Sequence, residues 1–492
     1  MKWKEKGCLS MNKTTQKYFI NLFKRKKRIL ALYTFIVFMA YPFLLITNLI
    51  TNDGKGLIDI TQTMLVLCEL ALAALAIILP LFTFKFAFVK KNVDTYFAIP
   101  LNRNHLFKAH FIAPILGTII PILVSYLLGG LFLIPDSGFD GYLILLLALL
   151  LVFIIFIVIY SMNTFIILKC NNIIDASIIT AAIGIVPLML YAALEAFLRS
   201  QVFNNGMLDS IIHKGPQLIV DLFSPYRGLV LVNEYVKFRG NNIQLDTLDI
   251  VLFMYYVVIG ILLIIEAKKS FKFKKGEDAE QLTTHYLTYP LLTNLGLISL
   301  ILNFNFTDYD ITEMIIILIA LFVAYMIIHA IAMRSFKINI KMILKFIILI
   351  VVVNVFNIVS KETEFFGINR NVIDYKQFEE VKFDLQFYNY ENDESTSYNV
   401  TIKTKETLTK EEQELFEYIK EIQKEKSIAF KNDDYDALYP NDINNGDVTL
   451  NIQYDRIADS GDYNTNDEFV YYQLSEEQAK YIEEILNKIE GE

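Results

Sequence analysis

Residues 142–168 form the run YLILLLALLLVFIIFIVIYSMNTFIIL, 27 residues without a charged side chain. A helix of that length extends about 40 Å at ~1.5 Å per residue, which exceeds the ~30 Å hydrocarbon core of a bilayer. Long apolar runs recur along the chain, whose apolar fraction is 54%. Soluble domains contain roughly 45–50% apolar residues. The sequence therefore predicts a polytopic α-helical membrane protein.

The positions of apolar runs and basic residues predict nine spans and their orientation. Lys and Arg cluster at the N-terminus and in segments 90–108, 268–275 and 334–345, whereas the short loop 304–313 is acidic. Because basic loops stay in the cytoplasm, we expect the N-terminus inside and the C-terminus outside. This orientation depends on the seventh and ninth spans, since losing either would place the C-terminal domain in the cytoplasm. The expected spans are 29–50, 63–88, 111–134, 142–168, 172–198, 247–266, 289–306, 312–333 and 342–359.

The first 28 residues are expected to lie in the cytoplasm. MKWKEKGCLS precedes a second methionine, Met11, and lacks the apolar stretch that a signal peptide would need before Cys8. From Met11 onward, apolar residues recur on one side of a helix that ends in five basic residues at 24–28. This pattern predicts an amphipathic helix on the cytoplasmic membrane surface, with membrane lipid as its partner.

The C-terminal part of the chain has a different character. Residues 360–492 have a net charge of −18, whereas the rest of the chain has +10. Two segments share the order strand, polar hairpin, strand and helix. Each helix opens with a capping box, at Thr409 to Glu412 and at Ser475 to Gln478. We expect a soluble α+β domain of two ββα repeats, with the helices packed on one antiparallel sheet.

Between the second and third expected spans lies KKNVDTYFAIPLNRNHLFKAH, residues 90–110. This segment is too polar for lipid, so it is expected to be a cytoplasmic loop. One interpretation is a solvated connector. The other is a short polar helix, broken by Pro100, that docks apolar side chains in a groove on a partner. The candidate contact residues are Asp94, Phe97, Ile99, Pro100, Arg103, Leu106 and Phe107.

The basic amphipathic helix, two spans and VDTYFAIPLNRNHLF, in that order, resemble the ABC-2 type permeases of bacterial ABC exporters. The resemblance covers residues 12–266, six spans, and includes Ser224-Pro225-Tyr226 in the loop before the sixth span. In that family the loop after the second span contacts the ATP-binding subunit, which would make loop 89–108 a coupling element. Similar permeases with an appended C-terminal domain occur in low-GC Gram-positive bacteria, which implies a bacterial cell membrane.

The apolar runs, the distribution of basic residues and this resemblance together predict four parts of the chain. They are a cytoplasmic N-terminus at 1–28, a six-span permease core at 29–266, a cytoplasmic linker with three further spans at 267–359, and an extracytoplasmic domain at 360–492. The sequence contains no G-x-x-x-x-G-K-[ST], so ATP and Mg would be bound by a separate ATPase subunit. Two permease subunits, as a homodimer or a heterodimer, would work with two ATPases.

No enzymatic chemistry is expected in this chain. The sequence lacks H-E-x-x-H, G-x-S-x-G and G-x-G-x-x-G, and its three cysteines are far apart. The turn DYNTNDE at 462–468 begins like a calcium loop but has Asp467 at the position that requires glycine, which favours a solvated hairpin tip. We therefore expect no metal, no cofactor and no nucleic-acid partner.

Four polar residues fall within expected spans, where ionisable groups are costly and often functional. Asp175 and Glu195 lie near helix ends, where exposure to lipid headgroups would explain them. Glu69 lies deeper and has either a packing role or a place along the transport path. Asn163 is a second candidate for the path or for an interface.

Two other classes of protein remain open at this point. A membrane sensor would bind a ligand with the outer domain and signal through the basic loops, although no expected cytoplasmic stretch exceeds about 30 residues. A membrane enzyme would need several polar residues at one depth, and only Glu69 is deep. The sequence does not identify a transported substrate, because a permease path is built from ordinary apolar and small polar residues.

Overall fold

The computed structural model describes most of the chain. Segments that lie outside the described residues include the N-terminal residues 1–12, part of the acidic loop predicted at 304–313, and most of the turn predicted at 462–468. The described residues are 13–52, 56–202, 216–229, 232, 236–237, 242–243, 247–283, 285, 288–302, 310–334, 340–366, 380–389, 394–404, 408–432, 434–438, 447–455 and 468–490.

Eight helical segments are long and apolar enough to cross a membrane, which confirms a multi-pass helical membrane protein. The first consists of two helices that meet at Tyr41, where Pro42 interrupts the hydrogen-bond pattern. The helices of the eight segments are α2 (Lys27–Ala40) with α3 (Pro42–Asn52), α4 (Leu57–Thr83), α6 (Arg103–Gly130), α7 (Ile134–Lys169), α8 (Ile173–Gln201), α12 (Thr247–Phe273), α14 (Ile311–Met333) and α15 (Ile340–Glu362).

Several boundaries differ from the prediction. The second span ends at Thr83, and a 3-10 turn, η1 (Lys85–Phe88), follows it; Phe86 and Phe88 of this turn are buried in the protein. The predicted seventh span corresponds to a shorter helix, α13 (Tyr289–Leu302), which extends about 21 Å at ~1.5 Å per residue. The nine-span count therefore stays a prediction.

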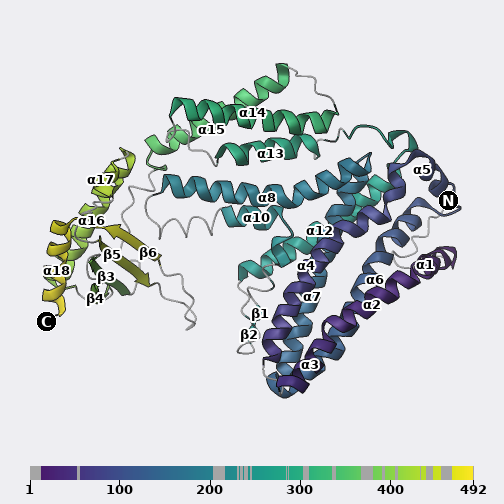
Figure 1. The fold of residues 1–492 in the computed structure, drawn as a ribbon, viewed down its shortest axis with the longest axis horizontal. Coiled ribbons are helices and arrows are strands. Elements are labelled where there is room, and N and C mark those ends of the chain that lie inside the picture. The colour runs from purple at the N-terminus through teal and green to yellow at the C-terminus, as the bar shows by residue number, and fades with distance from the viewer. Residues whose placement is uncertain are drawn as a thin grey trace, which may run out of the picture. The chain divides into compact units, whose positions relative to one another are not determined.

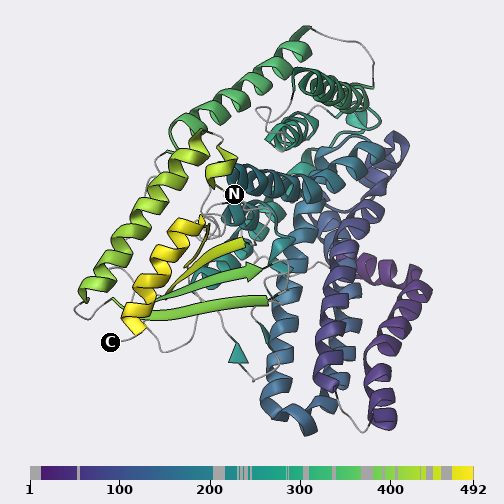
Figure 2. The same ribbon diagram turned by 60° about the vertical axis from the view of Figure 1, so that its left-hand side comes forward.

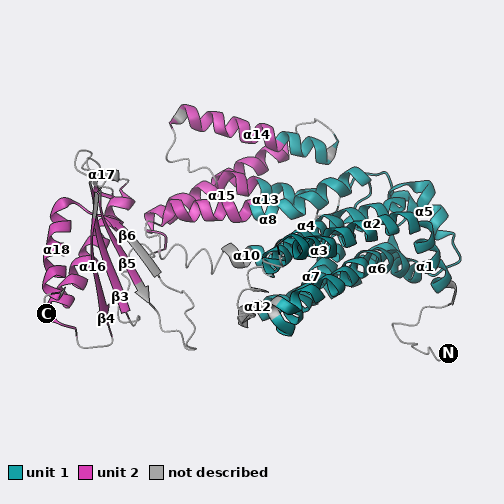
Figure 3. Cartoon of the chain, turned by 60° about the horizontal axis from the view of Figure 1, so that its bottom comes forward, with its two compact units in different colours: residues 1–188, 220–296, 326–337 teal, residues 189–219, 297–325, 338–492 magenta. Residues whose placement is uncertain are grey.

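The chain divides into two compact units (Figure 3), formed by residues 1–188, 220–296 and 326–337 and by residues 189–219, 297–325 and 338–492. In unit 1, α7 packs between α4 and α12, while α6 contacts α1 (Lys13–Arg25), α2 and α3. These helices run side by side in Figure 1. Gly260 of α12 permits the close approach to α7, because a Cβ at this position would lie 2.9 Å from Val158 Cγ2.

Unit 1 also contains short elements between the long helices. They are α5 (Lys90–Phe97), η2 (Leu131–Leu133), the end of α10 (Pro216–Phe223), a two-stranded ribbon of β1 (Val236–Lys237) and β2 (Asn242–Ile243), and η3 (Gly276–Asp278). We call the end of unit 1 where α4, α7 and α12 end, and where α6 and α8 begin, the basic end.

The C-terminal domain is built on one antiparallel sheet with the strand order β4-β3-β5-β6. Each half has the order strand, strand, helix: β3 (Glu380–Asn389), β4 (Glu394–Lys403) and α16 (Lys410–Lys431), then β5 (Asp447–Asp455), β6 (Glu468–Gln473) and α18 (Glu476–Glu490), with the short α17 (Tyr435–Leu438) between the halves. Figure 2 shows α16 and α18 on the same face of the sheet.

The core of this domain lies between the sheet and the two long helices. Central strands β3 and β5 pair Phe383 with Ile452 and Leu385 with Leu450, and all four side chains are buried. Both predicted capping boxes are present: the side chains of Thr409 and Glu412 exchange hydrogen bonds with each other's backbone, and so do those of Ser475 and Gln478.

Candidate functional site

The predicted coupling segment is a folded element at the basic end. Helix α5 ends at Phe97, two residues before Ile99 and three before Pro100. The next helix, α6, begins at Arg103 because the side chain of Asn102 accepts a hydrogen bond from the backbone N–H of Asn104 at 3.0 Å. A short polar helix followed by a proline turn thus connects two membrane helices.

Aromatic side chains hold this segment against the membrane helices. The Phe97 ring lies edge-on to Phe271 of α12, with centroids 5.5 Å apart, and Tyr96 stacks on Phe86 at 4.1 Å. Phe107 lies 5.7 Å from the same Phe271 ring. Such aromatic pairs contribute roughly 0.5–1.5 kcal/mol each beyond the area they bury. The segment is therefore packed into unit 1 and is more than a solvated connector.

Arg103 ties the segment to the end of α12. Its guanidinium carbon lies 4.0 Å from the centroid of the Phe97 ring, and its Nη1 donates to the carbonyls of Lys272 at 2.7 Å and Lys274 at 3.3 Å. The last carbonyls of a helix lack backbone partners and carry partial negative charge, so a cation at this position is favourable. Arg103 therefore caps α12, and its guanidinium is engaged within the chain.

The other candidate contact residues divide into exposed and buried groups. Asp94 and Pro100 are exposed, and Phe97 and Ile99 are half-buried. Leu106 and Phe107 are only 1% and 2% exposed, because the first turns of α6 pack against neighbouring helices. The surface that a partner can reach therefore excludes the side chains of the predicted Leu-Phe pair.

A segment that the sequence analysis did not single out lies beside α5. The turn η3 contacts α5, and a Cβ on Gly276 would lie 2.6 Å from the Asp94 carboxylate oxygen Oδ1. Lys275 and Glu277 on either side of this glycine are exposed. The accessible surface at the basic end is therefore formed by both α5 and residues 275–277.

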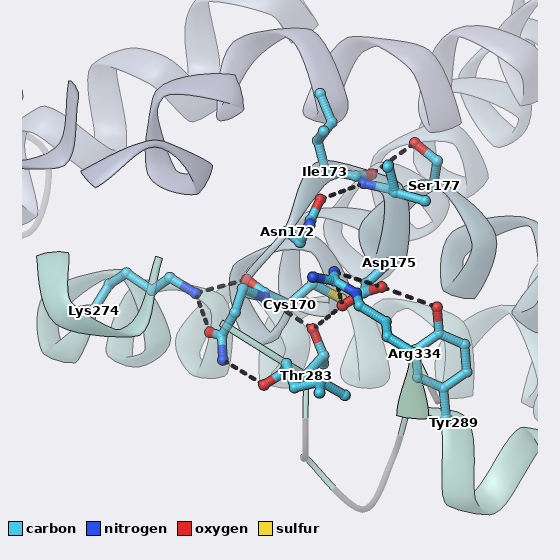
Figure 4. Close-up of polar contacts among 12 residues, drawn as sticks. Cys170, Asn172, Ile173, Asp175, Ser177, Lys274, Thr283, Tyr289 and Arg334 are labelled. Carbon is cyan, nitrogen blue, oxygen red and sulfur yellow. Dashed lines mark hydrogen bonds and ion pairs between the residues drawn. The ribbon is translucent and has the colours of Figure 1, made fainter. Parts of the chain in front are cut away.

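Lys274 joins this surface to the end of α7 (Figure 4). Its Nζ donates to the Cys170 carbonyl at 2.6 Å and to Asn171 Oδ1 at 2.9 Å, and the residue is 6% exposed. Burial lowers the pKa of Lys274 to about 8. The carbonyls at the end of α7 receive this ammonium group just as those of α12 receive Arg103.

Asp175 is the centre of a second polar cluster at the basic end (Figure 4). Its carboxylate accepts hydrogen bonds from Thr283 Oγ1 at 2.9 Å, from the Tyr289 hydroxyl at 3.1 Å and from Arg334 Nη2 at 3.3 Å. The expectation that headgroup exposure explains Asp175 is wrong, because this residue is 3% exposed. Hydrogen-bond donors that are distant in the sequence take the place of water around the Asp175 carboxylate. The residues next to Asp175 in the sequence could not reveal these partners.

The N-terminal helix α1 also docks at this end. The hydroxyl of Tyr18 lies 3.0 Å from Nε2 of His110 in α6, and Phe23 approaches α6 at Gly117. The basic residues 24–28 are exposed. The predicted amphipathic helix is thus present, with its apolar side on α6 and its basic residues at the surface.

Glu69 and Asn163 lie in the interior of unit 1. Asn163 in α7 donates through Nδ2 to the Ala76 carbonyl of α4 at 3.0 Å and to the Tyr226 hydroxyl at 3.1 Å. Glu69 is 4% exposed and shares the buried face of α4 with Ala76. The Ser224-Pro225-Tyr226 turn is therefore hydrogen-bonded to Asn163, a residue predicted for the transport path or an interface, and this contact lies inside a packed layer of helices.

Among the residues that the structure describes, no group of three or more His, Cys, Asp and Glu could hold a metal ion. The chain matches no protein-family model, no curated protein and no solved structure. The functional assignment therefore depends on the membrane helices and on the geometry of the basic end.

Proposed function

We propose that this chain is the membrane subunit of an ATP-binding cassette exporter and that a separate ATPase docks on the α5 segment. The observation that carries the proposal is the Arg103 clamp. A coupling element must pass displacement from a partner to the membrane helices, which requires rigid attachment. The contacts of Arg103 with the Phe97 ring and with the Lys272 carbonyl supply that attachment while Asp94 and Pro100 remain exposed.

Contacts of α8 support the proposed orientation, with the N-terminus inside and the C-terminal domain outside. A helix that crosses a membrane has its ends on opposite sides, so α8, the fifth crossing, would start inside and end outside. Near its end, Phe197 lies 5.4 Å from Phe356 of α15 and 6.4 Å from Phe365, between ring centroids. The C-terminal end of α15 and the domain that follows it would therefore lie on the outer side.

The start of α8 supports the crossing of α13. Arg334, which follows the end of α14, contacts Asp175 in the first turn of α8, so α14 would end inside. Helix α12 also ends inside in this orientation. The chain must then cross once between α12 and α14, and α13 is the apolar helix in that interval. In this proposal the chain would therefore cross a bacterial cell membrane nine times.

In this proposal the ATPase subunit would bind ATP and Mg. Two copies of the chain, or this chain with a related one, would stand on two ATPases, and α1 would hold the basic end at anionic lipid. Residues Glu69 and Asn163 would contribute to packing or to the transport path. The chain would have no catalytic site of its own.

A membrane sensor remains the second candidate, and one observation favours it. The Lys431 ammonium at the end of α16 lies 3.8 Å from a carboxylate oxygen of Glu364 and 3.9 Å from one of Glu362, which ties the soluble domain to the end of α15. A domain attached in this way could pass a ligand signal to α15. The two candidates differ in whether an ATPase binds the α5 segment.

The test is purification of the chain with a candidate cassette ATPase. The exporter proposal expects a stable complex and an ATPase rate that depends on the permease. Asp94→Lys, which reverses an exposed charge on α5, should reduce recovery of the complex, whereas Asp310→Lys, an equally exposed residue before α14, should not. Absence of a complex together with an unchanged ATPase rate would refute the proposal.

A further inference from the structure

Asp175 receives donors from three segments that are far from it in sequence. Thr283 belongs to the segment after α12, Tyr289 begins α13, and Arg334 follows α14. A carboxylate that is 3% exposed is costly to keep charged unless hydrogen bonds and a cation replace water. Thr283 and Tyr289 supply the hydrogen bonds, and Arg334 supplies the cation (Figure 4). Each of these contacts attaches a different segment of the chain to Asp175.

The same cluster is connected to the coupling segment through residues 170–171. Thr283 Oγ1 accepts from the backbone N–H of Asn171 at 3.1 Å while it donates to Asp175. The Asn171 side chain also accepts from Lys274 at 2.9 Å and donates to the Leu282 carbonyl at 3.2 Å. Lys274 in turn presents its carbonyl to Arg103 at 3.3 Å. A continuous series of polar contacts thus joins the Arg103 clamp to Asp175.

We propose that Asp175 is a positioning residue, a latch that holds the start of α13 and the end of α14 against the core and relays displacement of the coupling segment to them. The relay rests on the proposed function; the latch does not. Breaking the latch would leave the Arg103 clamp and the ATPase docking surface in place, but it would disconnect the α13–α14 pair from them.

The asymmetry of the ion pair suits a contact that opens and closes. The side chain of Asp175 is 4% exposed, whereas that of Arg334 is 40% exposed. Arg334 also has a φ of 48°, a left-handed conformation that a residue with a Cβ adopts only at a cost. Release would return a half-solvated guanidinium to water and relieve this backbone conformation, while admitting water to Asp175.

Cys170 is a native probe for the latch. It is 0% exposed, and its carbonyl is held by Lys274 beside the Asp175 cluster. In purified protein with Cys8 and Cys68 replaced by Ala, Asp175→Asn and Arg334→Gln should each increase the rate at which maleimide labels Cys170 by about tenfold or more, because each removes a charge-assisted hydrogen bond. Arg334→Lys should increase it less. Arg199→Gln, which breaks an exposed pair with Glu195, should leave it unchanged.

In the double variant Asp175→Asn with Arg334→Gln, Cys170 should be labelled no faster than in the faster single variant. Both substitutions break the same contact, so the second adds nothing to the first. Rates equal to those of the unsubstituted protein in both single variants would overturn the latch. So would a gain in the double variant equal to the product of the two single gains, because the residues would then act independently.

A second readout tests the relay. In complex with the ATPase, Asp175→Asn and Arg334→Gln should co-purify normally but lose most of the permease dependence of the ATPase rate, and Arg334→Lys should retain it. An unchanged dependence in both variants would overturn the relay. If the unsubstituted chain forms no complex, the proposed function and the relay fail together, while Cys170 labelling still decides whether the latch exists.

Discussion

The guanidinium carbon of Arg103 lies 4.0 Å above the ring of Phe97, two side chains that the sequence analysis placed on one docking surface. Their mutual contact means that Arg103 fixes Phe97 in position and caps α12 at the same time. The clamp gives the α5 segment a defined shape before any partner arrives. A preformed surface reduces the entropy lost on binding, which suits the proposed docking of an ATPase.

Loss of the clamp should loosen α5. Arg103→Ala removes the cation–π contact, ~1 kcal/mol, and two hydrogen bonds at the α12 end that together contribute at least about as much, so local opening should rise by roughly tenfold or more. Limited trypsin digestion at the exposed Lys90 and Lys91 measures this opening. Arg103→Lys should have a smaller effect, and Arg199→Ala should have none. Equal cleavage in all variants would show that the clamp does not order the segment.

The proposed orientation predicts which cysteines react from outside the cell. Ser397 on β4 and Glu277 in η3 are both exposed. In intact cells, a cysteine at 397 should react with a membrane-impermeant maleimide, whereas a cysteine at 277 should react only after lysis. Labelling of both sites only after lysis would place the C-terminal domain in the cytoplasm and reduce the number of crossings to eight.

The stability of the C-terminal domain should depend on pH through Lys426. Its Nζ donates to the Ala437 and Leu438 carbonyls at 2.6 and 2.9 Å, and burial lowers its pKa to about 8. Unfolded lysine has a pKa of ~10.4, so the unfolded chain binds more protons between pH 8 and 10. The free energy of unfolding should therefore rise with pH across this window, by about 1–2 kcal/mol.

Urea unfolding of the isolated domain at pH 7.5, 8.5 and 9.5 measures this dependence. Lys426→Met should remove it, because the variant has no titrating group at this position, whereas Lys424→Met, an exposed neighbour on α16, should keep it. Parallel curves for Lys426→Met and the unsubstituted domain would show that Lys426 has the same pKa in both states.

Gly228 should tolerate no side chain. It follows the Ser224-Pro225-Tyr226 turn, and a Cβ there would lie 2.9 Å from Ile155 Cδ1 and 3.0 Å from Tyr256 Cε2. Gly228→Ala should lower stability in detergent by about 1–3 kcal/mol through overpacking. Gly296→Ala is the control, because a Cβ there meets nothing within 4 Å. Thermal unfolding of the two variants compares them, and equal midpoints would contradict the packing at this turn.

Local features of the sequence determined the class of the fold. Run length alone predicted the long helices, because a bilayer core requires about 20 apolar residues per crossing. The capping boxes at Thr409 and Ser475 were predictable because their partners lie three residues away. Alternation of apolar residues predicted the four strands, since inward and outward side chains alternate along a strand.

The tertiary structure decided which of the candidate residues are buried and which distant residues they contact. Leu106 and Phe107 were predicted to meet a partner, but the helix that carries them turns them into the core. Asp175 was expected to be exposed to lipid headgroups, but it is buried, and its ion pair with Arg334 joins residues 159 positions apart. Periodicity in a sequence encodes which face of an element is buried. It does not encode which distant element covers that face, because such contacts depend on how all the helices pack together.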